Sequence, residues 1–268
     1  MSIWQVLILS LVQGITEFLP VSSSGHLILL PKFFNWADQG LAFDTIMHLA
    51  TLLAVIIFFR KKIWRLVTAV LNPKKNLEKI IDRKLAWLIL LASLPAGFFG
   101  FFLADFVDLH LRSSFLVALN LIFWAVILFV AEKYNFKFEN KKNLKDLNWK
   151  DSLFIGFFQA CALIPGTSRS GSTISAALFD KISKKDAIEF SFLIGIPIIA
   201  GAGLTQLFDL VKNGLENISV FLLGLGFLIA FISGLLAIKF LLQIVEKFGF
   251  LPFVIYRIFL AIVILFVL

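Results

Sequence analysis

Charged residues and cysteine are both scarce in this sequence. Only 16% of its 268 residues are charged and 60% are hydrophobic, with a mean hydropathy of +0.95. A soluble domain of ordinary composition has about 25% charged residues, so this chain is too apolar to be one. The single cysteine, Cys161, excludes an intramolecular disulfide. These absences predict an integral membrane protein.

Basic residues are unevenly placed, and none precedes Lys32. A secretory signal peptide begins with a basic segment, so we expect the first apolar segment to stay in the mature protein. The net charge of +8 would suit a nucleic-acid partner, but basic residues also gather in the cytoplasmic loops of membrane proteins. Their placement in this chain favours the loops, and we expect no nucleic-acid partner.

Six apolar segments are long enough to cross a bilayer, because about 20 apolar residues span its core of about 30 Å. They cover residues 41–59, 85–103, 115–131, 187–207, 220–240 and 251–268. Two further apolar regions, 3–30 and 153–179, are broken at residues 20–26 and 165–172. Each predicts a re-entrant helix-turn-helix. Non-helical backbone at membrane depth is stable only where protein or a water-filled cavity satisfies its amides, so we expect a polar cavity between helices.

The two interrupted regions resemble each other. Residues 13–28 laid on residues 159–174 without a gap match Gln13 to Gln159, Ser22 to Ser168, Ser24 to Ser170, Gly25 to Gly171 and Ile28 to Ile174. Each copy continues with three spans, so the second must enter the membrane upside down. We expect an all-α polytopic membrane protein with one domain over 1–268. It has six full transmembrane helices plus two re-entrant elements, in inverted-topology repeats over 1–131 and 150–268.

Loop charge gives this topology an orientation. One side of the predicted membrane domain holds most of the Lys and Arg residues. These are Arg60, Lys61, Lys62, Arg65, Lys74, Lys75, Lys79, Arg83, Lys84, Lys133, Lys137, Lys141, Lys142, Lys145, Lys150, Lys181, Lys184, Lys185, Lys239 and Lys247. The other side holds Lys32, Arg112 and Lys212. Because cytoplasmic loops are the richer in Lys and Arg, the first re-entrant loop enters from outside and the second from inside.

The first break places ionisable groups at membrane depth, where they are costly and functional by default. Gln13 and Glu17 are four residues apart and share a helix face, so their oxygens could hold one hard cation. A buried hydrogen bond that stabilises the fold is the alternative. Ser22, Ser23 and Ser24 follow Pro20 and precede an apolar helix, so they could cap it and leave its free amides facing an anion.

A histidine and an arginine complete this set. If the helix begins by Ser23, then His26 lies one turn further on the same face, where it could exchange a proton with a hydroxyl or a leaving group. A hydrogen-bonded core histidine is the alternative. Arg169 in the second break carries a planar fork that suits a phosphate, or it could pair with Glu17 structurally. His48 could face the cavity or only bond a neighbouring helix, and Arg257 could line the cavity or extend to the membrane interface. We interpret both as structural residues.

Together these groups supply charge neutralisation, a nucleophile and a proton donor, which phosphoryl transfer requires. A lipid-linked phosphate is the substrate that would reach this depth. A different class of function, lipid-phosphate transport or flipping, stays open because inverted repeats are typical of transporters. An ion channel fits less well, because Glu, His and Arg are not a ring of like carbonyls.

The two motifs resemble those of the undecaprenyl diphosphate phosphatase family, also called the bacitracin resistance protein family. The chain reads QGITEFLPVSSSGH over residues 13–26 and PGTSRSGST over 165–173. The resemblance implies hydrolysis of undecaprenyl diphosphate, a carrier recycled for peptidoglycan and other cell-envelope polymers. It also implies a divalent cation, Mg²⁺ or Ca²⁺, and a bacterial inner-membrane location with the active site facing outward.

The resemblance also implies roles for the matching residues. It makes Glu17, Ser23, His26 and Arg169 catalytic, with Gln13 and Glu17 at the metal. Its phosphate-binding residues are Ser22, Ser24, Ser168, Arg169, Ser170 and Thr173. Our mechanistic hypothesis is attack by Ser23 with help from His26, while His26 itself and activated water stay open as nucleophiles. The expected partners are the polyprenyl diphosphate and membrane lipids, with a homodimer left open.

Overall fold

The structure of the protein is a computed structural model that describes residues 1–72, 76–213 and 219–267. Lys74, Lys75 and Leu268, which belong to the expected loop charge and the last expected span, lie outside the described residues. All regular structure in the described part is helical, apart from an isolated bridge between Lys142 and Ile182. The expectation of an all-α polytopic membrane protein is confirmed.

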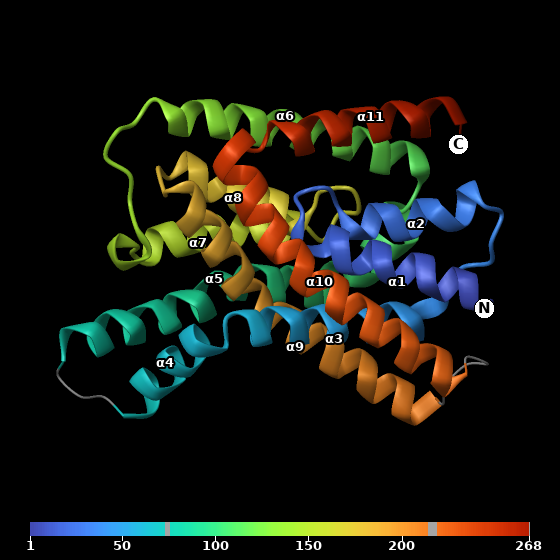
Figure 1. Cartoon of the computed structure of the whole chain (residues 1–268), viewed down its shortest axis with the longest axis horizontal. Helices are drawn as coiled ribbons and strands as arrows, with labels where there is room; N and C mark the ends of the chain where they lie inside the picture. Colours follow the sequence, from blue (N-terminus) through green and yellow to red (C-terminus); the bar gives the residue numbers. More distant parts are fainter. Residues whose placement is uncertain (73–75, 214–218, 268) are drawn as a thin grey trace.

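The helices follow one another along the chain with short connections (Figure 1). Their bounds are α1 Ile3–Phe18, α2 Ser23–Phe33, α3 Gly40–Phe58, α4 Arg60–Leu71, α5 Leu77–His110, α6 Ser114–Phe136, the 3-10 helix η1 Leu144–Asp146, α7 Trp149–Cys161, α8 Arg169–Phe179, α9 Lys184–Asn213, α10 Val220–Phe248 and α11 Leu251–Val267.

Each of the six expected spans corresponds to one helix over its described residues, except that 41–59 runs one residue past the end of α3, but the helices do not all reach the same length. In the described part, four helices (α5, α6, α9 and α10) are long and apolar enough to cross a membrane alone. A fifth crossing needs α3 and α4 together, and these are bent by 79°. The 17 residues of α11 rise about 26 Å at about 1.5 Å each, slightly less than the hydrocarbon core.

The segment after residue 59 is not the loop that its charge suggested. Arg60, Lys61, Lys62 and Arg65 lie on α4, and α5 begins at Leu77. The reason is amphipathicity, because α4 buries Leu66 and Ala69 while Arg60, Lys61 and Arg65 are exposed. The bend lets α4 turn away from the direction of α3, as an interfacial helix does.

Two helical hairpins approach each other from opposite ends of the molecule. In Figure 1 the hairpin α1–α2 opens toward the end that holds both chain termini, and α7–α8 opens toward the other end. Their turns meet in the interior, where the Ser170 hydroxyl donates to the Leu19 carbonyl at 3.0 Å. The breaks in the apolar pattern are therefore turns buried against each other. Protein groups can then satisfy their backbone amides at membrane depth.

Close helix packing holds the first hairpin in place. A Cβ atom added at Gly14 of α1 would lie 1.9 Å from Ser233 Oγ on α10, so only glycine permits this approach. Small residues at such crossings are typical of helices in membranes. The turn of this hairpin packs on the core through Phe18, whose ring meets that of Phe192 edge to face at 5.3 Å.

The second hairpin is anchored at its open end. Lys142, in the connection before α7, donates to Asp180 at 2.8 Å and to Asp151 at 3.1 Å. Although partial burial acts in the opposite direction, these two carboxylates raise the pKa of the Lys142 ammonium above its ordinary value. The Lys142 backbone also bonds to Lys181 and Ser183, which fixes the connection to the end of α8.

Candidate active site

Both buried turns use the same unusual backbone conformation. Ser22 and Ser168, the N-caps of α2 and α8, have φ of 74° and 71°. Each side chain accepts a hydrogen bond from a glycine N–H three residues on, Gly25 at 3.3 Å and Gly171 at 3.1 Å. A left-handed serine costs about 1 to 3 kcal/mol, and such strain is concentrated at functional sites. The two aligned segments, residues 13–28 and 159–174, thus share the same local structure at their turns.

Glu17 is the centre of the polar cluster where the turns meet. Its Oε2 accepts from Ser23 Oγ at 2.7 Å and from Gln13 Nε2 at 3.2 Å. Its Oε1 accepts from Arg169 Nη2 at 3.3 Å. The carboxylate is only 7% exposed, so this ion pair across 152 positions of the chain is strengthened by its surroundings. The structure thus joins both motifs in one site.

Arg169 is fixed by α9 as well as by Glu17. Its Nη1 donates to the Ser191 carbonyl at 3.1 Å. A Cβ atom at Gly195 would lie 2.0 Å from the same nitrogen, so the guanidinium rests directly on the α9 backbone. Its buried Nε has no hydrogen-bond partner within the described residues. A buried cation with an unpaired hydrogen-bond donor indicates an anionic ligand, because a buried donor that makes no hydrogen bond costs free energy.

Gln13 offers an oxygen beside the Glu17 carboxylate. Its Nε2 is used by Glu17 and by His48 Nδ1 at 2.9 Å, whereas its buried Oε1 has no partner in the described part of the chain. His48 Nδ1 also lies 3.6 Å from Glu17 Oε2, so His48 belongs to the cluster. Our interpretation of His48 as merely structural missed this, since nothing in a linear sequence relates α3 to α1.

These oxygens fit a hard cation only in part. No group of three or more His, Cys, Asp and Glu side chains forms a metal cluster among the residues that the structure describes. Gln13 turns Nε2 to Glu17, so its Oε1 would join the Glu17 carboxylate as a second oxygen ligand only after the amide rotates. Mg²⁺ is commonly held by one or two carboxylates together with substrate phosphates and water. The donor set therefore suits a cation that arrives with a phosphate substrate.

His26 makes different contacts from those we expected. Its Nδ1 lies 2.7 Å from the Ser22 carbonyl and its Nε2 lies 2.6 Å from the Tyr256 hydroxyl. Ser23 instead donates to Glu17. The reason is that the imidazole turns back onto the start of its own helix, where the Ser22 carbonyl accepts from both the His26 backbone N–H and Nδ1. The geometry thus makes Glu17, and not His26, the proton acceptor nearest to Ser23.

The other expected phosphate ligands are partly engaged in holding the turns. Ser24 Oγ lies 3.4 Å from Ser22 Oγ, and Ser170 Oγ lies 3.2 Å from Ser168 Oγ. Thr173 Oγ1 donates to the Arg169 carbonyl at 2.7 Å and meets Ser191 Oγ at 2.6 Å. Their positions beside Arg169 and Ser23 remain compatible with phosphate binding.

Arg257 stabilises the junction, in agreement with its structural interpretation. Its side chain is fully buried. It donates four hydrogen bonds to carbonyls of both turns and of α6, namely those of Leu121, Pro20, Gly166 and Thr167, at 2.8 to 3.2 Å. Tyr256, the residue before Arg257 on α11, is a site residue that the sequence analysis missed, because one tyrosine in an apolar helix is no signal.

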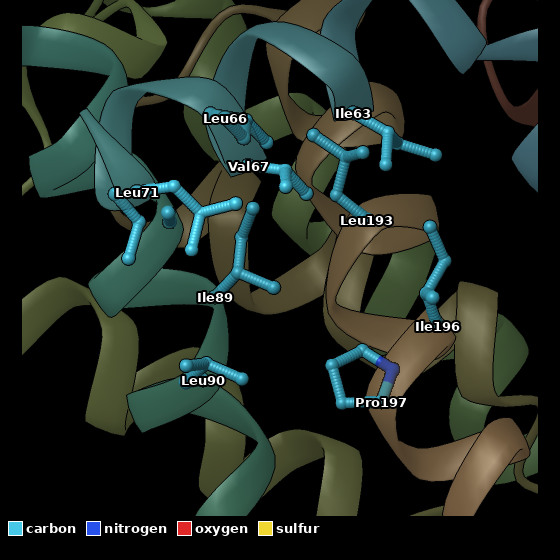
Figure 2. A pocket seen from close by; sticks show the side chains of 11 residues that line it. Ile63, Leu66, Val67, Leu71, Ile89, Leu90, Leu193, Ile196 and Pro197 are labelled. Carbon is cyan, nitrogen blue, oxygen red and sulfur yellow. The ribbon is translucent and has the colours of Figure 1, made fainter. Parts of the chain in front are cut away.

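A pocket elsewhere in the described part of the protein has no polar or charged side chains. Figure 2 shows it among aliphatic side chains of α4, α5 and α9, with a volume of about 310 Å³. Leu66, Ile89, Leu193 and Pro197 are among its lining residues, and none of those residues is charged. The polar cluster at the hairpin turns is therefore the candidate active site.

Comparison with known proteins agrees with the motifs. Residues 6–263 match the model of the family described as "Bacitracin resistance protein BacA". The chain belongs to the bacitracin resistance protein family. This confirms the resemblance drawn from residues 13–26 and 165–173, and it makes the chain a multi-pass membrane protein of a bacterial family.

Two relatives from this family are similar over nearly their whole length. The chain is 44% identical over 266 residues to "Undecaprenyl-diphosphatase" of Thioalkalivibrio sulfidiphilus, with 99% of each chain covered. It is 42% identical over 263 residues to "Undecaprenyl-diphosphatase 1" of Pseudoalteromonas translucida, with 98% of this chain and 97% of the relative covered. Similarity of this extent includes both hairpins and all the helices between them.

Proposed function

We propose that this chain hydrolyses undecaprenyl diphosphate to undecaprenyl phosphate and inorganic phosphate, and so recycles the carrier for peptidoglycan and envelope synthesis. The observation that carries the proposal is the contact of Glu17 with both Ser23 and Arg169 at the buried turns. It places a hydroxyl nucleophile, a proton acceptor and an anion-binding cation together. The printed names of the two relatives agree with this activity.

The reaction uses Ser23 as the nucleophile. Its Oγ attacks the terminal phosphorus, and its proton goes to Glu17, 2.7 Å away. The bond from that phosphorus to the bridging oxygen breaks, so undecaprenyl phosphate leaves with the electron pair. Water then attacks the phosphoserine. The bond from phosphorus to Ser23 Oγ breaks, Ser23 Oγ takes back the proton held by Glu17, and the phosphate leaves with the oxygen and both protons of the water, so the enzyme is restored.

Arg169 orients the diphosphate during both steps. The Arg169 side chain keeps 13% of its surface exposed, so its guanidinium can meet a phosphate oxygen while Nη1 stays on the Ser191 carbonyl. Gln13 and Glu17 would hold a divalent cation, Mg²⁺ or Ca²⁺, which supplies charge neutralisation when bound. Ser22, Ser24, Ser168, Ser170 and Thr173 surround the same space as supporting donors.

The site lies within a bacterial inner membrane and opens outward. With six spans, counting α3 and α11, and two re-entrant hairpins in inverted repeats, we expect the polar cluster at the repeat interface. The opposite approach of the two hairpins supports this topology (Figure 1). So does the loop charge, which assigns the end with Lys142 and Lys184 to the cytoplasm. The transport alternative has only the architecture in its favour, and architecture alone assigns no function.

Phosphate release from C55 prenyl diphosphate by detergent-purified protein tests the proposal, with and without EDTA. We expect metal-dependent release that Glu17→Ala, His26→Ala and Arg169→Ala variants reduce at least about 100-fold. Ser175→Ala is the matched control, because this buried hydroxyl on α8 bonds to the Gly171 carbonyl outside the cluster. Absence of release by the wild type in lipid-supplemented assays would refute the hydrolase.

A further inference from the structure

A lateral groove lies beside the active site, between α1 and the start of α11. It has a volume of about 310 Å³ and is lined by Ile15, Leu19 and Val21 of the first hairpin and by Phe253 and Tyr256 of α11. None of its lining residues is charged. Ile15 is 36% exposed and Tyr256 is 39% exposed, so in a membrane the groove is open to the lipid chains.

Two contacts connect this groove to the polar cluster. The Leu19 side chain lines the groove, while its carbonyl accepts from Ser170, the neighbour of Arg169. Tyr256 lines the groove with its ring, while its hydroxyl lies 2.6 Å from His26 Nε2. The groove thus adjoins the site at the turn of the first hairpin and α11.

The position of the proton on the His26 ring follows from the contacts of its two nitrogens. A carbonyl oxygen only accepts hydrogen bonds, so the contact between His26 Nδ1 and the Ser22 carbonyl requires the proton on Nδ1. In the neutral ring Nε2 then accepts from the Tyr256 hydroxyl. The Ser22 carbonyl therefore fixes the His26 tautomer, and Tyr256 covers the nitrogen that could exchange a proton, which makes Tyr256 a positioning residue.

We propose that this groove binds the isoprenoid chain of the substrate where the chain leaves the diphosphate. The inference rests on the proposed function and adds the site for the lipid part. The groove is uncharged and reached from the bilayer, and the adjoining cluster holds the Arg169 cation with an unpaired donor. A ligand with an anionic head and an apolar chain satisfies both sides at once.

The pocket under α4 does not meet this requirement. Its lining residues Leu193 and Ile196 lie on α9, the helix that Arg169 contacts through Ser191 and Gly195 (Figure 2). The α9 backbone thus separates that pocket from the cation. A chain in that pocket could not belong to a lipid whose head lies beside Glu17. The groove at α11 is therefore the better place for the chain.

Site-specific photo-crosslinking tests the groove without depending on catalysis. The photoreactive residue p-benzoylphenylalanine replaces Ile15 in one variant and Leu11 in the control, because Leu11 lies one turn earlier on α1, is 46% exposed and does not line the groove. The probe is radiolabelled C55 prenyl monophosphate in phosphatidylglycerol nanodiscs. We expect capture at position 15 to exceed capture at position 11 at least about fivefold and to fall when unlabelled prenyl phosphate is added. Equal capture at the two positions, or capture that unlabelled prenyl phosphate does not reduce, overturns the proposal that the groove binds the isoprenoid chain.

Kinetics provide a second measurement on the same positions. Ile15→Trp fills the groove and should raise KM for the C55 diphosphate about tenfold with little change in kcat, whereas Leu11→Trp changes neither. An unaltered KM in a folded Ile15→Trp variant overturns the assignment of the groove to the isoprenoid chain. The two proposals fail separately. Specific capture at position 15 with no phosphate release refutes the hydrolase and keeps the groove, and release without specific capture does the reverse.

Discussion

Removing the Glu17 carboxylate and the Ser23 hydroxyl, singly and together, tests whether they act as one unit. A positioned proton acceptor contributes about 10² to 10⁴ in rate, which is about 3 to 5 kcal/mol of the barrier. The 2.7 Å contact makes Glu17 the acceptor for Ser23. We therefore expect Glu17→Gln and Ser23→Ala each to lose activity in this range.

The double variant gives the decisive number. If the pair acts as a unit, the combined loss equals that of the worse single variant, because each substitution disables the same step. If the residues act independently, the losses multiply and their free energies add within about 0.5 kcal/mol. The assay is single-turnover phosphate release from C55 prenyl diphosphate, with thermal midpoints in detergent to verify that each variant is folded.

A second cycle with His26 compares the two possible proton acceptors. Ser23→Ala combined with His26→Ala should be closer to additive, since His26 contacts Ser22 and Tyr256 and not Ser23. Additivity for the Ser23 and Glu17 pair, together with full coupling for Ser23 and His26, would refute the reasoning. It would restore His26 as the partner of Ser23.

Three further perturbations follow from the described contacts. Arg257→Lys should lower the thermal midpoint, with a loss of about 2 to 4 kcal/mol, because one ammonium cannot reach carbonyls that three guanidinium nitrogens serve. Tyr256→Phe should reduce kcat and change its pH dependence, because it removes the hydroxyl bonded to His26 Nε2. Lys142→Met should destabilise the protein by about 1 kcal/mol at neutral pH, because Asp151 and Asp180 lose their cation.

The stability contributed by Lys142 has a defined pH window. Its pKa is raised in the folded protein, so the contribution is complete below the ordinary lysine value of about 10.4 and is lost as the pH rises through the folded value. The wild type should therefore lose this stability at alkaline pH, and Lys142→Met should not show that step. Identical alkaline melting curves for the two proteins would contradict the assignment.

The Tyr256 variant has a matched control on α6. Tyr134→Phe removes the hydroxyl of the other tyrosine in the chain, on α6 outside the site, and should leave the pH dependence of kcat unchanged. A Tyr256→Phe profile that matches the wild type would show that the hydroxyl only packs. An Arg257→Lys variant as stable as the wild type would show that Lys can satisfy the same carbonyls.

The membrane character, both buried turns and the residues at them were predictable from sequence. The apolar segments are long, and a polar break within them has few explanations at membrane depth. Glu17 and Ser23 lie six positions apart in one motif, so their proximity is local. Arg169 was expected beside them because the second break repeats the first, and the structure brings it to Glu17.

Helix α4 and the bend before it were not predictable in the same way. The basic residues from Arg60 to Arg65 suggested a loop, because charge patterning gives the side of the membrane and not the backbone conformation. The helix forms because its apolar residues pack on α5 and α9, as Leu66 does in Figure 2. That partner surface exists only once distant segments have folded together.

The sequence by itself determined that the protein folds in a lipid bilayer, that its two turns are capped, and which residue types lie at the active site. These features depend on composition and on contacts within a few positions. The tertiary structure alone decided which partners those residues take. His26 meets Tyr256 across 230 positions, and Gly195 admits the Arg169 side chain onto α9. In a bilayer every apolar helix face is equally compatible with lipid, so the rotation of each helix is fixed by close packing and a few polar contacts that no linear pattern encodes.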